Sequence, residues 1–259
     1  ISFNGSFNKN KITELPEQVY YTWGCGNGDN ISNVGRALGS WLGFKTDGVF
    51  HTQDEVDAYK AAYEIQYGNP GVGRLKYVDT NNDGIINAKD RVVLGSDQPS
   101  FIGGLNLSAS WKGFDLSLFF NGMVRKAWNN SKFYTDLWAY WSGNHSTRLL
   151  NAYDAWNEFK STGRYNSNIP ALTTDGSNNE NQSSDFFLED GSFIKLKTIT
   201  LGYTLPQEIL SKLHLRNLRV YVQSQNLFTI TSYTGADPEG LGYPYPIPRT
   251  FTFGLSIGL

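Results

Sequence analysis

Apolar and polar residues alternate along residues 249–259. Every second position is apolar, and Thr, Gly or Ser residues separate the apolar residues Phe251, Phe253, Leu255, Ile257 and Leu259. A period of two is typical of a β-strand with one apolar and one small polar face. The segment also matches the roughly 9 to 11 residues of a tilted strand that crosses a bilayer. A strand of a soluble β-sandwich shows the same alternation, so this segment leaves both alternatives open.

The same alternation predicts five further strands. They cover residues 1–11, 101–111, 114–121, 192–205 and 218–231. Lys112-Gly113 joins the second strand to the third, and a two-residue turn with Gly is a strong hairpin signal. Between Leu196 and Ile199 the apolar positions change from even to odd numbers. This change predicts either a β-bulge or the boundary of a lipid-facing band.

The connections between the six predicted strands alternate between long and short. The long connections cover about 13–100, 125–190 and 232–248. We expect the first to be irregular apart from a helix over 53–67, and the second to contain a helix over 147–159. Long connections on one side of a sheet and short turns on the other are typical of outer-membrane barrels.

Six strands are too few to close such a barrel, because bacterial examples start at about eight strands. The chain also begins without Met and inside an alternating strand, with neither a charged nor an apolar leader segment. We therefore expect this sequence to be a fragment whose upstream part is missing.

Composition narrows the function classes. The formal net charge is −2, so neither nucleic acid nor an anionic membrane surface is indicated as a partner. Aromatic residues make up 15% of the chain and glycines number 27, which favours strands with tight turns over helices. Cys25 is the single cysteine, so no disulfide forms within the chain. No run of about 18 apolar residues occurs, which excludes a spanning helix and leaves a β-barrel open.

Several segments are specific enough to indicate a family. The chain closely resembles the late-strand signatures of the SusC/RagA family of TonB-dependent outer-membrane transporters at residues 184–206 (SDFFLEDGSFIKLKTITLGYTLP), 218–231 (LRVYVQSQNLFTIT) and 248–255 (PRTFTFGL). Three further segments resemble landmarks of the family and follow one another in the family's order: residues 46–50 (TDGVF), 76–84 (KYVDTNNDG) and 101–106 (FIGGLN). The resemblance covers essentially the whole chain. One departure is Leu259, because such barrels more often end on an aromatic residue.

The resemblance implies an all-β fold in which residues 1–259 form the C-terminal six strands of a large, roughly 22-stranded antiparallel transmembrane β-barrel. The N-terminal plug and the earlier strands would be absent here. It implies a nutrient importer in the outer membrane of a Gram-negative bacterium, surrounded by outer-membrane lipid, and not an enzyme. Such importers take up glycans or peptides together with a SusD-like surface lipoprotein, using energy that the TonB complex delivers through the plug region.

One stretch of the first long connection matches an EF-hand-type calcium loop. Oxygen-bearing side chains stand at loop positions 1, 3, 5, 9 and 12, as Asp79, Asn81, Asp83, Asn87 and Asp90. Gly84 lies where the chain must turn sharply, and Ile85 offers its carbonyl. Asp90 replaces the usual bidentate Glu, as in dockerin-type loops. The pattern predicts a structural Ca²⁺; the alternative is an Asx-rich turn without metal, held by hydrogen bonds to the backbone.

Four aromatic residues gather in the second long connection, namely Trp128, Trp138, Tyr140 and Trp141. If they are exposed outside the membrane, they are candidates for contact with the SusD-like partner or with the substrate. The alternative is that they fill a small core of their own beneath the connection.

Two other function classes compete with the importer. The aromatic residues and the Asp79–Asp90 loop also suit a secreted calcium-dependent carbohydrate-binding β-sandwich. A glycoside hydrolase would need two carboxylates that converge in a cleft, and no pair stands out among the 24 acidic residues.

Overall fold

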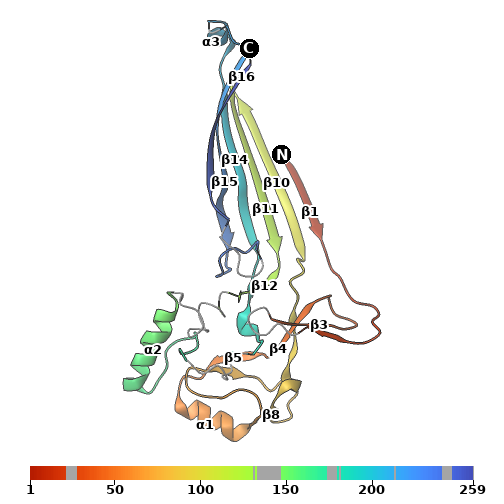
Figure 1. Cartoon of the computed structure of the whole chain (residues 1–259), viewed down its shortest axis with the longest axis vertical. Coiled ribbons are helices and arrows are strands. Elements are labelled where there is room, and N and C mark those ends of the chain that lie inside the picture. Colours follow the sequence, from red (N-terminus) through yellow and green to blue (C-terminus); the bar gives the residue numbers. More distant parts are fainter. Residues whose placement is uncertain are drawn as a thin grey trace.

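The computed structural model describes residues 1–21, 28–130, 132, 147–173, 180, 182–212, 214–240 and 247–258. Its elements form two regions that follow one another along the long axis of the molecule (Figure 1). We name them the long sheet, which has six strands, and the insertion region, which comprises the described residues of 19–95 and 126–190. The predicted all-β character is confirmed.

The long sheet contains all six strands that the alternation predicts. Its spatial order is β1-β10-β11-β14-β15-β16, and every neighbouring pair is antiparallel. The strands are β1 (Ser2–Phe7), β10 (Phe101–Trp111), β11 (Phe114–Val124), β14 (Phe193–Thr204), β15 (Asn217–Thr231) and β16 (Thr250–Gly258). Long antiparallel strands form here because each segment keeps a period of two over its whole length.

The connections leave the long sheet asymmetrically, as expected. At one end, the turn end, lie the β10–β11 hairpin and the short helix α3 (Gln207–Lys212); the insertion region lies at the other end, the insertion end (Figure 1). Lys112 and Gly113 both have positive φ, at 46° and 86°, which a tight two-residue hairpin of this twist requires. The predicted hairpin is therefore confirmed.

A β-bulge interrupts β14. The pairing register shifts between Leu196 and Thr198 against β15, and the pairing with β11 shifts at the same place. In the pairing with β11, Lys197 is the extra residue, and it sets the parity change that the sequence shows between Leu196 and Ile199. In the pairing with β15 the extra residue lies in β15, because Leu196 pairs with Phe228 and Thr198 with Gln225. Of the two alternatives left open by the sequence, the bulge is confirmed.

The two faces of the long sheet differ in chemistry. The register places most apolar residues of the six strands on one face, which we name the apolar face; examples are Phe3, Leu105, Phe120, Leu201, Val222 and Phe253. Much of this face is exposed, and Phe253 has 82% of its surface accessible. The opposite, polar face carries mainly short hydroxyl and amide side chains, such as Asn4, Asn106, Ser117, Thr200, Gln223 and Thr252.

The insertion region is folded, in contrast to the irregular connection expected over 13–100. It holds the sheet β2-β3-β4-β9 and the pairs β5–β7, β6–β8 and β12–β13. These strands are β2 (Val19–Tyr21), β3 (Asp29–Ser32), β4 (Ser40–Gly43), β5 (Thr46–Val49), β6 (Glu64–Ile65), β7 (Leu75–Tyr77), β8 (Ile85–Ile86), β9 (Val92–Gly95), β12 (Lys126–Trp128) and β13 (Leu188–Asp190). Two to four residues are too few to show a period, so the sequence did not reveal them.

Two helices and two short 3₁₀ turns, η1 (Ala88–Asp90) and η4 (Asp185–Phe187), complete the insertion region. Helix α1 (Gln53–Ala62) starts behind the predicted cap Thr52, whose side chain accepts the N–H of Glu55. It ends five residues before the predicted boundary, because the chain becomes extended at Tyr63 and enters β6. Helix α2 (Leu149–Thr162) lies within three residues of its predicted range.

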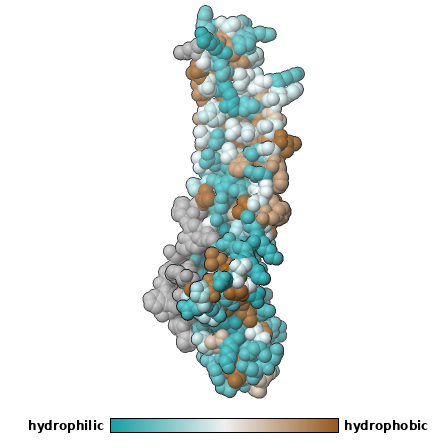
Figure 2. Space-filling view, turned by 90° about the vertical axis from the view of Figure 1, so that its right-hand side faces the viewer, coloured by the Kyte–Doolittle hydropathy of each residue, from teal (hydrophilic) through white to brown (hydrophobic). Residues whose placement is uncertain are grey.

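Two clusters of buried side chains form the core of the insertion region. The first brings Phe44, Phe50 and Tyr77 together with Tyr165 and Ala171, so it joins segments far apart in the sequence. The second consists of Trp41, Leu94, Trp128 and Phe187. Hydrophilic residues cover most of the visible outer surface of this region (Figure 2). Among the described residues, no helix is long and apolar enough to cross a membrane.

Candidate functional site

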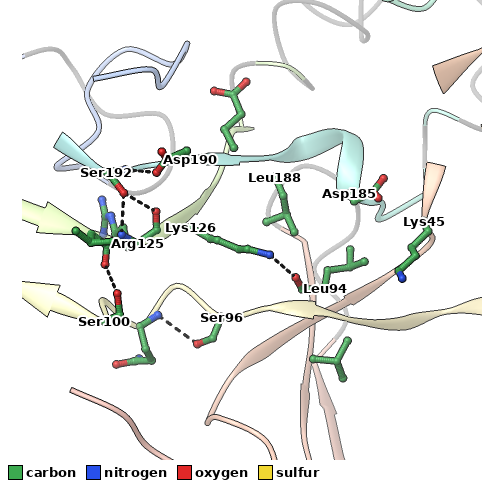
Figure 3. Close-up of a pocket in the computed structure, with 14 residues that line it drawn as sticks. Lys45, Leu94, Ser96, Ser100, Arg125, Lys126, Asp185, Leu188, Asp190 and Ser192 are labelled. Atoms are coloured by element: carbon green, nitrogen blue, oxygen red, sulfur yellow. Dashed lines mark hydrogen bonds between the residues drawn. The ribbon is translucent and has the colours of Figure 1, made fainter. Parts of the chain in front are cut away.

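The ends of three neighbouring strands meet the insertion region at a cleft. Ser100 precedes β10, Arg125 follows β11 and Ser192 precedes β14. Together with β9 and β13 they border an open cleft of about 930 Å³ (Figure 3). Its lining combines hydroxyl groups, charges of both signs and a few aliphatic side chains, and none of the described lining residues is aromatic.

Hydrogen bonds fix the rim of this cleft. The N–H of Ser100 donates to the carbonyl of Val124 at 2.9 Å, and the N–H of Gly191 donates to the carbonyl of Arg125 at 3.0 Å. Lys126 Nζ donates to the carbonyl of Leu94 in β9 at 3.2 Å (Figure 3). The cleft wall therefore belongs to both regions, and a ligand held there would contact the long sheet and the insertion region together.

A cluster of buried charges lies beside the cleft. Lys195 Nζ lies 3.0 Å and 3.2 Å from the two carboxylate oxygens of Asp237 and 2.9 Å from Glu239 Oε2. Lys197, the bulge residue, lies 2.6 Å from both oxygens of Glu239. Arg125 Nη2 donates to the carbonyls of Pro238 and Glu239. Only 3% of the Lys195 side chain is exposed, and its charge is met by two carboxylates.

The surroundings of Glu239 and Arg125 shift the pKa values of both groups. Burial acts to raise the pKa of Glu239, but hydrogen bonds from Lys197 and Lys195 outweigh it, so the pKa lies below its ordinary value. Burial lowers the pKa of the Arg125 guanidinium, and nearby carboxylates, Asp97 and Glu239 among them, act against that fall. An Arg side chain stays protonated in proteins despite such a shift.

The connection between β15 and β16, which carries Asp237 and Glu239, is also bonded to the insertion region through Thr234. Its N–H and hydroxyl donate to Glu189 of β13 at 2.8 Å and 2.7 Å. Its hydroxyl oxygen accepts from Asn129 at 3.0 Å and from Arg148, next to α2, at 2.8 Å. Burial acts to raise the pKa of Glu189, but the Thr234 N–H and the charge of Lys132 lower it overall.

The polar face carries a second ion pair near the turn end. Arg219 of β15 donates to both carboxylate oxygens of Asp115 of β11 at 2.9 Å and 2.6 Å. The bridge crosses β14 above Gly202, where a Cβ atom would lie 2.4 Å from Asp115 Oδ1 and 2.5 Å from Arg219 Nη2. The side chains of Asp115 and Arg219 occupy the space above Gly202, so a larger residue at this position would have to displace them.

The predicted calcium loop is held by hydrogen bonds to its own backbone. The Asp79 carboxylate accepts from the N–H groups of Asn82 at 2.7 Å and Gly84 at 2.8 Å. The buried Asp90 accepts from Thr80 at 2.9 Å and Asn87 at 2.9 Å. These are the contacts of the metal-free alternative. Among the described residues, no group of three or more His, Cys, Asp or Glu side chains is placed to hold a metal.

Calcium binding by this loop therefore stays a prediction. The predicted ligands are Asp79, Asn81, Asp83, Ile85, Asn87 and Asp90. The donor set is compatible with a weak site: Asp79 Oδ1 already accepts the N–H groups of Asn82 and Asp83, whereas Asp79 Oδ2 and both Asp90 oxygens accept one each and keep a further lone pair. Burial acts to raise the pKa of Asp79, but the four N–H groups of the turn lower it overall, so this carboxylate is ionised at neutral pH.

The contact role predicted for Trp128 is wrong in this structure. Its side chain is 3% exposed and its ring stacks on Phe187 with centroids 5.4 Å apart. The alternative in which these aromatic residues fill a core is the one that Trp128 follows, because β12 pairs with β13 and turns the indole inward. Trp138, Tyr140 and Trp141 lie outside the described residues, so their role stays a prediction.

Comparison with known proteins decides the family. No family model matches the chain. It is 31% identical over 280 residues to the TonB-dependent receptor P3 of Formosa agariphila, across 99% of this chain and 26% of that receptor. It is 29% identical over 266 residues to the TonB-dependent receptor SusC of Bacteroides thetaiotaomicron, across 99% of this chain and 24% of that receptor. The chain is a homologue of the SusC/RagA-type TonB-dependent receptors.

Solved structures place this SusC-like chain in the same fold. The structure of the RagAB peptide transporter superimposes with a TM-score of 0.73 at 24% identity, across 99% of this chain and 26% of that one. The RagAB peptide importer in its open-open state gives a TM-score of 0.70. The predicted barrel-type fold is thereby confirmed. The SusC-like chain spans about a quarter of the length of the curated relatives that it matches.

Sequence reasoning missed the charge cluster of this SusC-like chain. Lys195 and Lys197 stand two residues apart in an otherwise apolar and Thr-rich strand, directly at the predicted bulge. That spacing is a usable signal, because two lysines on a half-buried strand need carboxylate partners. The partners Asp237 and Glu239 lie about 40 residues later in a connection without periodicity, so the pairing itself was not readable.

Proposed function

We propose that this chain is a section of the wall and the external region of a TonB-dependent nutrient importer in the outer membrane of a Gram-negative bacterium. One observation carries the proposal: the long sheet has an exposed apolar face and a polar face. Lipid tails suit the first face and a plugged or water-filled lumen suits the second. The insertion region, with its hydrophilic surface, would then lie outside the membrane.

The substrate that we propose is an oligosaccharide or an oligopeptide. The cleft between the regions offers hydroxyl groups together with Lys126, Asp185 and Asp190, and such groups bind the polar atoms of either class. A SusD-like surface lipoprotein would cover the insertion end, and the TonB complex would act through a plug region that this chain does not span. The similarity to SusC and to the RagAB peptide transporter supports these assignments.

Gene deletion and complementation test the proposal. Cells that lack the full-length receptor are expected to lose uptake of either defined oligosaccharides or defined oligopeptides, and the wild-type gene restores it. The receptor should fractionate with the outer membrane and co-purify with an acylated lipoprotein. Unchanged uptake of both classes, or a receptor secreted as a soluble protein, would contradict the importer.

The alternative β-sandwich is not supported. In a sandwich the apolar face of a sheet packs against a second sheet and is buried. Here Phe251, Phe253 and Leu255 remain exposed along β16. The relatives are receptors or transporters, in agreement with the prediction that the chain is not an enzyme.

A further inference from the structure

The connection between β15 and β16 contacts both regions of the molecule. We name residues 232–240 of this connection the strap. Thr234 is held by Glu189 and Asn129 of the insertion region, whereas Asp237 and Glu239 are held by lysines of β14 in the long sheet. Figure 1 shows the chain after β15 curling at the insertion end of the sheet.

The strap lies over the polar face. Lys195 is paired across the sheet with Asn121 and Thr229, which places its side chain on the polar face. It is nevertheless almost fully buried, and its ammonium group contacts Asp237 and Glu239. The strap therefore covers Lys195. Because Lys195 is the third residue of β14 from the insertion end, the covered point lies at the mouth of the polar face.

Lys197 supplies the second contact point. It stands two residues after Lys195, so ordinary alternation places both side chains on the polar side of β14. Its ammonium group lies 2.6 Å from both carboxylate oxygens of Glu239. Both lysines therefore hold the strap at the mouth of the polar face.

The contacts between the strap and the long sheet are of a kind that can open reversibly. Three cations, Arg125, Lys195 and Lys197, meet the strap through ionic and polar contacts. When such a contact opens toward water, both partners regain hydration, so the desolvation that opposed the pairing is recovered. If apolar contacts held the strap, their opening would instead expose hydrophobic surface to the water on the polar face.

We propose that Arg125, Lys195 and Lys197 are positioning residues that hold the strap across the mouth of the transport path and thereby limit the size of the substrate that passes. The inference rests on the proposed function, because the polar face is a transport path only if the chain belongs to an importer. It goes beyond that function by assigning size selection to a named strap and its cations.

The test compares charge variants of the full-length receptor in cells. Lys195→Met removes the buried cation, Lys195→Arg retains it, and Glu239→Gln removes the carboxylate that both lysines share. Lys60→Met, on the exposed side of α1, is the matched control. Hydrogen exchange of residues 232–240 is measured on the purified receptor. Uptake is measured with a length series of maltooligosaccharides and a length series of oligoalanines.

We expect Lys195→Met and Glu239→Gln to speed exchange in the strap at least about tenfold, since the contacts that close it are lost. Both variants should import longer members of the accepted series than the wild type does. Lys195→Arg and Lys60→Met should keep the wild-type exchange and length limit. A purely structural role would reduce uptake of all lengths alike, which separates it from size selection.

Each of the remaining outcomes contradicts one part of the proposal. Unchanged exchange in Lys195→Met and Glu239→Gln would show that the charges do not hold the strap. Faster exchange with an unchanged length limit would overturn size selection. If the wild-type receptor imports neither series and the deletion strain loses no uptake, the proposed function fails, while the exchange result still decides whether the cations hold the strap.

Discussion

Aromatic residues have opposite surroundings in the two regions of this molecule. In the insertion region Phe44 is 0% exposed and stacks on Tyr77, with ring centroids 4.6 Å apart. In the long sheet Phe253 stands in the middle of its strand and faces outward. The insertion region buries the apolar side chains of its two clusters, whereas the long sheet presents most of its apolar side chains on one face over six strands.

The two regions therefore suit different solvents. An apolar face of this extent is stable only against another apolar phase, because water makes its exposure unfavourable. The insertion region carries its own core and a hydrophilic surface, so water suits it. The strap and the cleft lie where these two regions meet, and the ion pairs of Lys195 and Lys197 with Asp237 and Glu239 lie there.

The largest effect is expected from the core of the insertion region. Phe44→Ala should destabilise this region by about 3 to 5 kcal/mol, because a fully buried aromatic side chain leaves a cavity. Hydrogen exchange of β5 and β7 in the full-length receptor measures the loss. Leu150→Ala, on an exposed position of α2, is the control and should change stability by less than about 0.5 kcal/mol. Equal effects would mean that the region has no core of its own.

The second effect concerns the two faces of one strand. Phe253→Arg should cost about 2 to 4 kcal/mol when the receptor folds into lipid vesicles, because the charge would enter the hydrocarbon. Thr252→Arg, one residue away on the polar face, should cost far less. Urea titration of folding, followed by the gel mobility of the folded barrel, compares the two variants. A similar cost on both faces would refute the assignment of lipid and lumen sides.

A smaller effect is expected on the polar face itself. Gly202→Ala should destabilise the sheet by about 1 to 3 kcal/mol, because the new Cβ collides with the Asp115–Arg219 bridge. The same titration measures it. In an Asp115→Ala background the bridge is gone, and the cost of Gly202→Ala should fall. An unchanged cost would place the strain in the backbone and not in the bridge.

The smallest effect is expected from calcium. If the Asp79–Asp90 loop binds Ca²⁺ with a Kd of about 0.1 to 1 mM, as extracellular sites of this type do, about 1 mM Ca²⁺ adds about 0.4 to 1.4 kcal/mol. Isothermal titration of the full-length receptor measures binding, and Asp79→Asn should weaken it. Absence of binding heat at about 10 mM would leave the hydrogen-bonded turn as the correct interpretation.

The strands of the long sheet can be predicted from the sequence more readily than those of the insertion region, for a physical reason. Strands such as β10 and β15 carry their period over eleven and fifteen residues, so local pattern reveals them and even the bulge at Lys197. In the insertion region, β6 pairs with β8 over two residues, and Phe44 belongs to the same cluster as Tyr165, more than a hundred positions away. Such contacts leave no local signature.

The amino-acid sequence by itself determined the six long strands, their hairpin and bulge, and the family, because alternation and signature segments are properties of neighbouring residues. Only the tertiary structure decided that the long connections fold around a shared core, that Trp128 belongs to this core, and that Lys195 and Lys197 meet Asp237 and Glu239. The reason is that burial and ion pairing depend on which distant segments the fold brings together, and a one-dimensional pattern does not carry that information.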